Sequence, residues 1–262
     1  MSLERKAEIL RRPATVALED LMKEPYASIL CYPRASEAEL QSRVGELGGL
    51  GVEAVEFAGK GSASNVPVLG KGYVGIVVAA HLKGQRLALK IRRIDADRAS
   101  LHHEAEMLVK ANSVQVGPNL VSHSDNFLLM QLIEGDLLPV WLETGREREA
   151  VRKVLADILG QCWRLDSVGL DHGELSKAPK HLIVDYAGHP WIFDFETASA
   201  TRKPANVTAV CQYLFLGGSV VAKSVNDAFG KRDTAEVREA LRRYKKERTP
   251  ESFCRVQQIC LA

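Results

Sequence analysis

The sequence predicts a mixed α+β protein, in which an antiparallel sheet is followed by a mostly helical half and preceded by a small α/β extension. Three observations lead to this fold class. Short segments rich in β-branched residues follow one another between residues 66 and 133, as in a twisted antiparallel sheet. Residues 147–165 instead repeat apolar side chains at helical spacing. Before the sheet, the small turn-forming residues 59–65 mark a boundary.

The boundary and the change of periodicity divide the chain into three predicted parts. These are an N-terminal α/β extension over residues 1–62, a sheet-bearing lobe over residues 63–134 and a helical lobe over residues 135–262.

Within the extension, the pattern predicts two strands and one helix. Residues 27–33 and 52–57 have the composition of strands. Residues 36–47 have an amphipathic pattern, and Ser36 stands where a capping side chain is expected.

In the sheet-bearing lobe, turn residues separate the apolar segments, and Gly84 is placed to turn the second pair of strands. The predicted strands are residues 66–69, 74–82, 86–92, 120–123 and 127–133. We expect a helix over residues 97–111 between the third and fourth strands.

The helical lobe is predicted to contain one short β-hairpin. Its strands are residues 182–184 and 191–193, which follow the helix over residues 147–165. A further helix is expected over residues 206–215, and the charged segment 231–248 reads as a solvated helix.

Composition excludes several classes of protein. The 262 residues carry a net charge of +2, so no global basic field favours nucleic acid or an anionic membrane. Five scattered cysteines without metal spacing indicate a reducing compartment. Met1 to Lys6 lack a signal-type apolar core, and no apolar run approaches eighteen residues, so we expect a cytoplasmic protein without a membrane partner.

A glycine-rich segment opens the predicted sheet, with Gly70, Gly72 and Gly75 in the spacing G-x-G-x-x-G. In a dinucleotide-binding fold the third glycine opens a helix, whereas Gly75 is followed by β-branched residues that favour a strand. A strand-turn-strand loop of this kind can lie over phosphates, because glycine lets backbone N–H groups approach the oxygens closely. A plain glycine-rich hairpin is the alternative.

Lys90 occupies the middle of an otherwise apolar predicted strand. Burial of an ammonium group is costly unless a carboxylate or an anionic ligand shares the site. The following helix offers Glu104 and Glu106; Glu104 fits better, because Met107 and Leu108 are its apolar helix neighbours. Alternatively both acids lie on a solvated face and Lys90 extends to solvent.

Two further segments concentrate ionisable residues, namely Asp171-His172-Gly173-Glu174-Leu175-Ser176 and Ile192-Phe193-Asp194-Phe195-Glu196. Together with the glycine loop and Lys90, they stand in the order found in protein kinases. The chain thereby resembles the atypical protein kinases of the RIO and Bud32 group. The resemblance spans residues 66–215 and is strongest to archaeal predicted serine/threonine kinases with a His-Gly-Glu-Leu-Ser catalytic loop. It implies a truncated bilobal protein-kinase-like fold.

The resemblance implies roles for individual residues. Lys90, paired with Glu104, would contact the phosphates of ATP, Asp194 would bind Mg²⁺, with Mn²⁺ as an alternative, and Glu174 would orient the attacking hydroxyl. The residues expected to cover the phosphates or face adenine are Gly70, Gly72, Gly75, Val77, Met130, Gln131 and Ile133.

The sequence also departs from the kinase pattern. Glu174 stands where most kinases have an aspartate, and Glu196 stands where they have a glycine. His181 takes the place of the asparagine that serves as a second metal ligand, although Mg²⁺ prefers oxygen. The segment after Asp194 is short and lacks an Ala-Pro-Glu motif, which removes the platform for extended peptides.

These residues predict an ATP-dependent serine/threonine protein kinase that phosphorylates an unidentified protein, with the chain itself as one candidate. Two alternatives remain open: a small-molecule phosphotransferase, and an ATP-binding switch or slow ATPase acting on an RNA–protein assembly. The basic residues of the tail, taken with the resemblance to the RIO group, leave a ribonucleoprotein partner as a weak alternative to a solvated helix.

Overall fold

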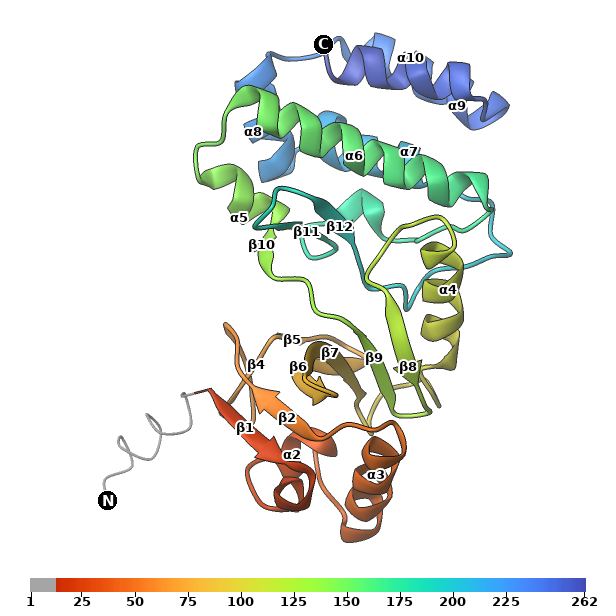
Figure 1. The fold of residues 1–262 in the computed structure, drawn as a ribbon. Coiled ribbons are helices and arrows are strands. Elements are labelled where there is room, and N and C mark those ends of the chain that lie inside the picture. The colour runs from red at the N-terminus through yellow and green to blue at the C-terminus, as the bar shows by residue number, and fades with distance from the viewer. Residues whose placement is uncertain (1–12) are drawn as a thin grey trace. The chain divides into compact units, whose positions relative to one another are not determined.

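The computed structural model describes residues 13–262, so the expectation based on Met1 to Lys6 lies outside the described residues. The chain forms two compact units (Figure 1). The first, here called the sheet unit, contains the described residues 13–105 and residues 119–132. The second, the helical unit, contains residues 106–118 and 133–262. An antiparallel sheet occupies the N-terminal half and most helices the C-terminal half, which confirms the predicted mixed α+β class.

The sheet of the sheet unit has seven antiparallel strands. Six of the strands are hydrogen-bonded in the order β1-β2-β6-β7-β9-β8. The seventh, β5, pairs only with β6. The strands are β1 (Ala14–Ala17), β2 (Ala54–Phe57), β5 (Gly70–Lys71), β6 (Gly75–Leu82), β7 (Gln85–Arg92), β8 (Leu120–His123) and β9 (Phe127–Gln131). A separate hairpin joins β3 (Gly61–Ala63) to β4 (Val66–Val68). All five strands predicted for the sheet-bearing lobe are therefore present.

The predicted strand over residues 27–33 is wrong. These residues form the short helix α2 (Ala27–Leu30), which buries Ala27, Ile29 and Leu30. A short apolar run has no periodicity that separates a strand from a buried helix, and prolines at 25 and 33 bound this one. A 3-10 helix, η1 (Leu18–Met22), precedes it.

The predicted capped helix of the extension is confirmed as α3 (Glu37–Gly49), and Ser36 Oγ accepts a hydrogen bond from the Glu39 N–H at 3.3 Å. Arg43 on this helix is fully buried. Its guanidinium donates to the backbone oxygens of Leu30 and Arg92 at 2.8 and 2.6 Å, and to Asn126 Oδ1 at 3.0 Å. This network ties the extension to the central sheet, so both sides of residue 62 belong to one compact unit.

Helix α4 (His102–Asn112) begins at His102 rather than near residue 97 as predicted. Tertiary hydrogen bonds use the backbone before it: Arg98 O accepts from Arg92 Nη1 at 3.2 Å, and Leu101 N–H donates to Asp125 O at 3.0 Å. Because these backbone groups are bonded to residues outside the helix, they do not take part in an earlier first turn. The local sequence pattern does not reveal such long-range contacts.

The helical unit is built around α6 (Arg148–Ser167), which buries the apolar face predicted for residues 147–165. The predicted hairpin is present as β11 (Leu182–Asp185) and β12 (Pro190–Ile192), and β10 (Gly135–Leu137) pairs with β11. The other elements are α5 (Leu138–Glu143), η2 (Leu175–Lys177), α7 (Asn206–Cys211), η3 (Gln212–Leu216), α8 (Val220–Phe229), α9 (Thr234–Glu247) and α10 (Pro250–Cys260). The predicted helix over residues 206–215 is thus continued as a π-helical turn, η3.

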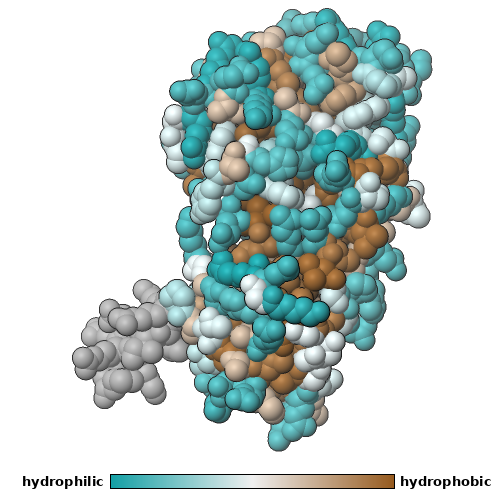
Figure 2. All heavy atoms as spheres, in the orientation of Figure 1, coloured by the Kyte–Doolittle hydropathy of each residue, from teal (hydrophilic) through white to brown (hydrophobic). Residues whose placement is uncertain are grey.

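Helices α9 and α10 carry mainly hydrophilic atoms on the face shown in Figure 2. The charged side of α9 is exposed, as expected of a solvated helix, and Arg242 and Arg243 pair with Glu239 and Glu247. A ribonucleoprotein partner for this face stays a prediction.

None of the helices between residues 13 and 262 is both long enough and apolar enough to cross a lipid bilayer.

Candidate functional site

The glycine-rich segment forms a tight hairpin in the sheet unit. Gly72 N–H donates to Gly75 O at 2.8 Å, and Gly70 pairs with Val77 across β5 and β6. The third glycine opens a strand rather than a helix, as the β-branched residues predicted. The glycine-rich segment is therefore a strand-turn-strand loop, and it lacks the helix that a dinucleotide-binding fingerprint requires.

Gly75 has a steric reason to be glycine. A side chain built there would place its Cβ 2.9 Å from Ile91 O and 3.0 Å from Lys90 Cγ. The Lys90 side chain thus passes over Gly75, and Val77 and Lys90 are register partners on β6 and β7. The absence of a side chain at this glycine therefore leaves the space that the Lys90 side chain occupies.

The Lys90 ammonium forms a buried ion pair with Glu104 of α4. Nζ lies 2.9 Å from Oε1 and 2.8 Å from Oε2, and the two side chains are 7 % and 6 % exposed. Glu106, the other candidate, is exposed. Because burial of either charge alone is costly, the pair fixes both side chains in one geometry.

The predicted adenine-facing segment divides between the two units. Met130 and Gln131 end β9 in the sheet unit, and Ile133 begins the second part of the helical unit. The backbone N–H of Gln131 donates to Asn119 O at 2.8 Å. This amide is therefore already engaged within the sheet unit.

In the helical unit, the loop that follows α6 begins at Asp171, whose backbone forms an antiparallel bridge with Ser199. The Asp171 carboxylate accepts from Arg202 Nε and from the backbone N–H of Ala205 at 2.8 Å. These contacts hold the start of the loop against the segment after Asp194. Asp171 and Arg202 were not predicted to have roles; the arginine was missed because nothing local in the sequence marks it.

Gly173 lies two residues after Asp171 and has a backbone φ of +91°, a conformation that residues with side chains rarely adopt. A Cβ at this position would lie 2.5 Å from Arg202 Nη2 and 3.2 Å from Thr197 O. Glycine is therefore required twice, by conformation and by space. The resulting turn directs the chain into Glu174.

His172 is completely buried, and its Nε2 lies 3.1 Å from Phe193 O. Burial lowers the pKa of the imidazole to about 4, against a smaller opposing effect of the hydrogen bond to Phe193. The ring is therefore neutral near pH 7, and with its proton on Nε2 it donates to Phe193 O. This contact joins the loop to the residue before Asp194, so His172 supports the loop.

Glu174, His181 and Asp194 lie together in the helical unit. His181 Nε2 is 3.5 Å from Glu174 Oε2, and its Nδ1 is 3.8 Å from Asp194 Oδ2. The His181 side chain is 13 % exposed, whereas those of Glu174 and Asp194 are 39 % and 30 % exposed. The imidazole thus stands between two carboxylates that both reach solvent.

The hairpin explains how His181 and Asp194 meet. Phe193 N–H donates to His181 O at 3.2 Å, which extends the pairing of β11 and β12 by one step. Asp194 then leaves the sheet with a φ of +70°, a left-handed conformation that few residues other than glycine, asparagine and aspartate adopt readily. The turn moves its carboxylate off the strand direction and beside the imidazole.

A buried polar cluster lies beneath this loop. Asp166 Oδ1 accepts from the Asn206 side-chain amide at 2.8 Å, and Asp166 Oδ2 accepts from Tyr244 Oη at 2.7 Å. Asn206 Oδ1 in turn accepts from the His172 backbone N–H at 2.8 Å. Burial raises the pKa of the Asp166 carboxyl, although these hydrogen bonds oppose the shift. None of these three supporting residues was predicted, because their partners are far apart in sequence.

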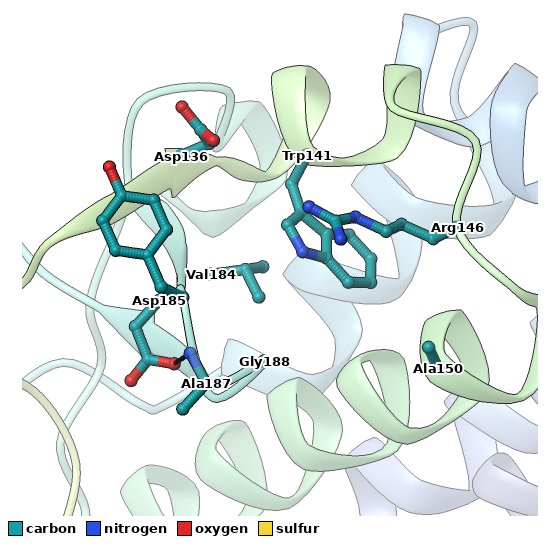
Figure 3. A pocket seen from close by; sticks show the side chains of 9 residues that line it. Asp136, Trp141, Arg146, Ala150, Val184, Asp185, Ala187 and Gly188 are labelled. Carbon is teal, nitrogen blue, oxygen red and sulfur yellow. Dashed lines mark hydrogen bonds between the residues drawn. The ribbon is translucent and has the colours of Figure 1, made fainter.

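The helical unit also contains an open pocket of about 440 Å³, beside the turn between β11 and β12. Arg146 lies over the Trp141 ring in Figure 3, with its guanidinium carbon 5.3 Å from the ring centroid. Asp185 on the opposite wall accepts from Ala187 N–H at 3.0 Å and from Trp191 Nε1 at 2.9 Å. The carboxylate is thus occupied in shaping the turn, and the pocket contains none of the predicted site residues.

Comparison with known protein-family models and with curated proteins gives no match to this chain.

Proposed function

We propose that this protein is an ATP-dependent phosphotransferase of atypical protein-kinase-like fold, which transfers the γ-phosphoryl group to a serine or threonine hydroxyl of a protein. One observation carries the proposal: the Lys90–Glu104 ion pair, buried beneath a glycine hairpin at the predicted positions. A purely structural hairpin does not need a buried charge there, and hydrophobic residues would pack as stably.

The sheet unit would hold the phosphates. Glu104 neutralises Lys90 and fixes the direction of its ammonium. The glycines of the hairpin would let phosphate oxygens approach the backbone closely, although the Gly72 N–H is itself engaged with Gly75 O. Since the Gln131 amide is engaged with Asn119, Ile133 is the better candidate for the backbone contact to adenine.

The helical unit offers a donor set that fits a divalent metal ion. Asp194 and Glu196 offer carboxylate oxygens within 4.8 Å of one another, and oxygen ligands suit Mg²⁺. His181 Nδ1 faces Asp194 from 3.8 Å, and an imidazole at this position is better suited to Mn²⁺ than to Mg²⁺. The metal ion would neutralise the charge that develops on the phosphoryl oxygens.

Glu174 is the residue that would orient the attacking hydroxyl. Its carboxylate is partly exposed, within reach of the His181 ring, and carried by the turn at Gly173. A group in this role must come within about 2.6–3.2 Å of the hydroxyl it serves. His181 would hold the carboxylate in place, so that catalysis depends mainly on positioning and charge neutralisation.

The test is transfer from γ-labelled ATP by purified protein, with Mg²⁺ or Mn²⁺, to itself and to a mixture of candidate proteins. Wild type is compared with Asp194→Asn and Glu174→Gln. Glu149→Gln is the matched control, because Glu149 is an exposed carboxylate on α6, 78 % exposed. We expect label on serine or threonine in the wild type and in Glu149→Gln, and its loss in the two site variants.

Two results would replace the proposal. Release of free phosphate with no labelled protein would favour the ATP-dependent switch. Transfer of label to a small alcohol, but to no protein, would favour a small-molecule phosphotransferase.

A further inference from the structure

A second group of ionisable side chains lies in the sheet unit, distinct from the Lys90–Glu104 pair. His102 opens α4, His123 ends β8, and Asp125 lies in the turn between β8 and β9. His102 Nδ1 and His123 Nδ1 are 3.2 Å apart, and His102 Nε2 is 2.7 Å from Asp125 Oδ1. The arrangement brings two imidazoles and a carboxylate together at the surface.

The carboxylate determines the tautomer of His102. With Asp125 accepting a hydrogen bond from Nε2–H, Nδ1 of the neutral ring carries a lone pair, and this lone pair faces His123 Nδ1. A histidine that binds a metal commonly donates its other N–H to a carboxylate in this way, which fixes the ring and raises its basicity. Asp125 therefore occupies the position of such a supporting group.

The spacing of the two nitrogens suits a tetrahedral metal ion. Two nitrogens bound to Zn²⁺ at about 2.0–2.1 Å with a tetrahedral angle stand about 3.3–3.4 Å apart. A square-planar ion with similar bonds would require about 2.8–3.0 Å. The observed 3.2 Å lies closer to the tetrahedral value.

We propose that His102 and His123 bind a Zn²⁺ ion through their Nδ1 atoms, with Asp125 supporting His102 from behind. The His102 side chain is 49 % exposed, so water can fill the two remaining positions and the ion can enter from solvent. Because His102 begins α4 and His123 ends β8, the bound ion would cross-link the start of α4 to the end of β8 within the sheet unit. Zinc should therefore stabilise the folded protein by binding it in preference to the unfolded chain.

The competing interpretation is a hydrogen-bonded relay, in which His123 Nδ1–H donates to His102 Nδ1. The chain offers a control for the contribution of a histidine–carboxylate pair alone. His189 Nδ1 lies 3.0 Å from Asp157 Oδ2, yet its ring neighbour is Trp191. Such a pair has the supporting carboxylate without a second imidazole against it.

The experiment titrates ZnSO₄ into metal-free, tag-free protein at pH 7.5 by isothermal calorimetry, with 5 mM Mg²⁺ present. We compare wild type, His123→Ala, Asp125→Asn, His189→Ala and His181→Ala. One zinc-binding event should disappear in His123→Ala and weaken about ten- to a hundredfold in Asp125→Asn. It should be unchanged in His189→Ala and in His181→Ala.

A second measurement does not depend on the variants. In NMR spectra of the wild type, substoichiometric Zn²⁺ should shift or broaden the imidazole signals of His102 and His123 and leave those of His189 unaffected. Zinc binding that survives in His123→Ala, or that is lost in His181→Ala, would overturn the proposal, as would unshifted His102 and His123 signals.

Discussion

The two units treat their charged groups differently. In the sheet unit, Lys90 and Glu104 are buried together, and Arg43 is buried among oxygen acceptors. In the helical unit, Glu174 and Asp194 remain partly exposed and His181 lies near both. The first arrangement fixes a cation in place, whereas the second presents carboxylates that solvent can reach.

The difference indicates a division of roles. Buried ion pairs contribute little net stability, so their retention needs another reason, such as fixing one geometry for a ligand. Partly exposed carboxylates are suited to metal binding instead. We therefore expect changes in the sheet unit to alter stability strongly, and changes at the carboxylates of the helical unit to alter activity with little effect on stability.

The sharpest test of this division is Asp194→Asn. Asparagine tolerates the positive φ of this position and has nearly the same volume, so the fold should be unchanged. Loss of the carboxylate charge should lower the rate of phosphoryl transfer about a hundred- to a thousandfold. Steady-state transfer rates and thermal unfolding, measured together, check the prediction. A large fall in the unfolding temperature would contradict the assignment of an active role to this carboxylate.

In the sheet unit, Lys90→Met should instead destabilise the fold by about 3 kcal/mol, because it removes the cation that pairs with buried Glu104. The double variant Lys90→Met/Glu104→Met should recover most of that loss, since apolar residues of similar size can replace a buried pair. Urea unfolding measures both, and activity should be absent in both.

A single substitution that costs less than about 1 kcal/mol would show that the Lys90 pair is accessible to solvent rather than buried. In that case the contrast between the two units would weaken.

Stability should also depend on pH through His172 of the helical unit. The folded-state pKa is about 4, below the ordinary value of 6.5, so the unfolded chain binds more protons between these values. Stability is then lost as pH falls through this window, by about 2 kcal/mol between pH 7 and pH 5. Urea unfolding at several pH values should show this slope in the wild type and a smaller slope in His172→Gln. Equal slopes would mean that His172 is not the group that titrates.

Local pattern was sufficient for the elements whose periodicity is long or whose partners are near. Helix α6 and strands β6 and β7 were predicted for this reason, and Glu104 was preferred to Glu106 because its apolar helix neighbours defined the buried face. The choice needed only the spacing of residues on one helix.

What the sequence did not predict depends on distant partners. Arg43 bonds to Asn126, 83 positions away, and Tyr244 bonds to Asp166, 78 positions away. No local rule relates such residues, and α2 was mistaken for a strand because a short apolar run fits both conformations. In the candidate site, the engagement of the Gln131 amide with Asn119 was equally invisible from the sequence.

The smallest expected effect concerns the turn that carries Glu174. Gly173 and Gly169 both have positive φ, at +91° and +70°, but a Cβ on Gly169 meets no atom within 4 Å. Gly169→Ala should therefore cost only the backbone term, about 1 kcal/mol. Gly173→Ala should cost about 1 kcal/mol more, since Arg202 must give up its hydrogen bond to Thr197 O at 3.1 Å. The two free energies of unfolding are compared by urea titration, and phosphoryl transfer is measured alongside. If the turn positions Glu174, activity falls in Gly173→Ala and not in Gly169→Ala; an equal fall in both would place the cause in general destabilisation.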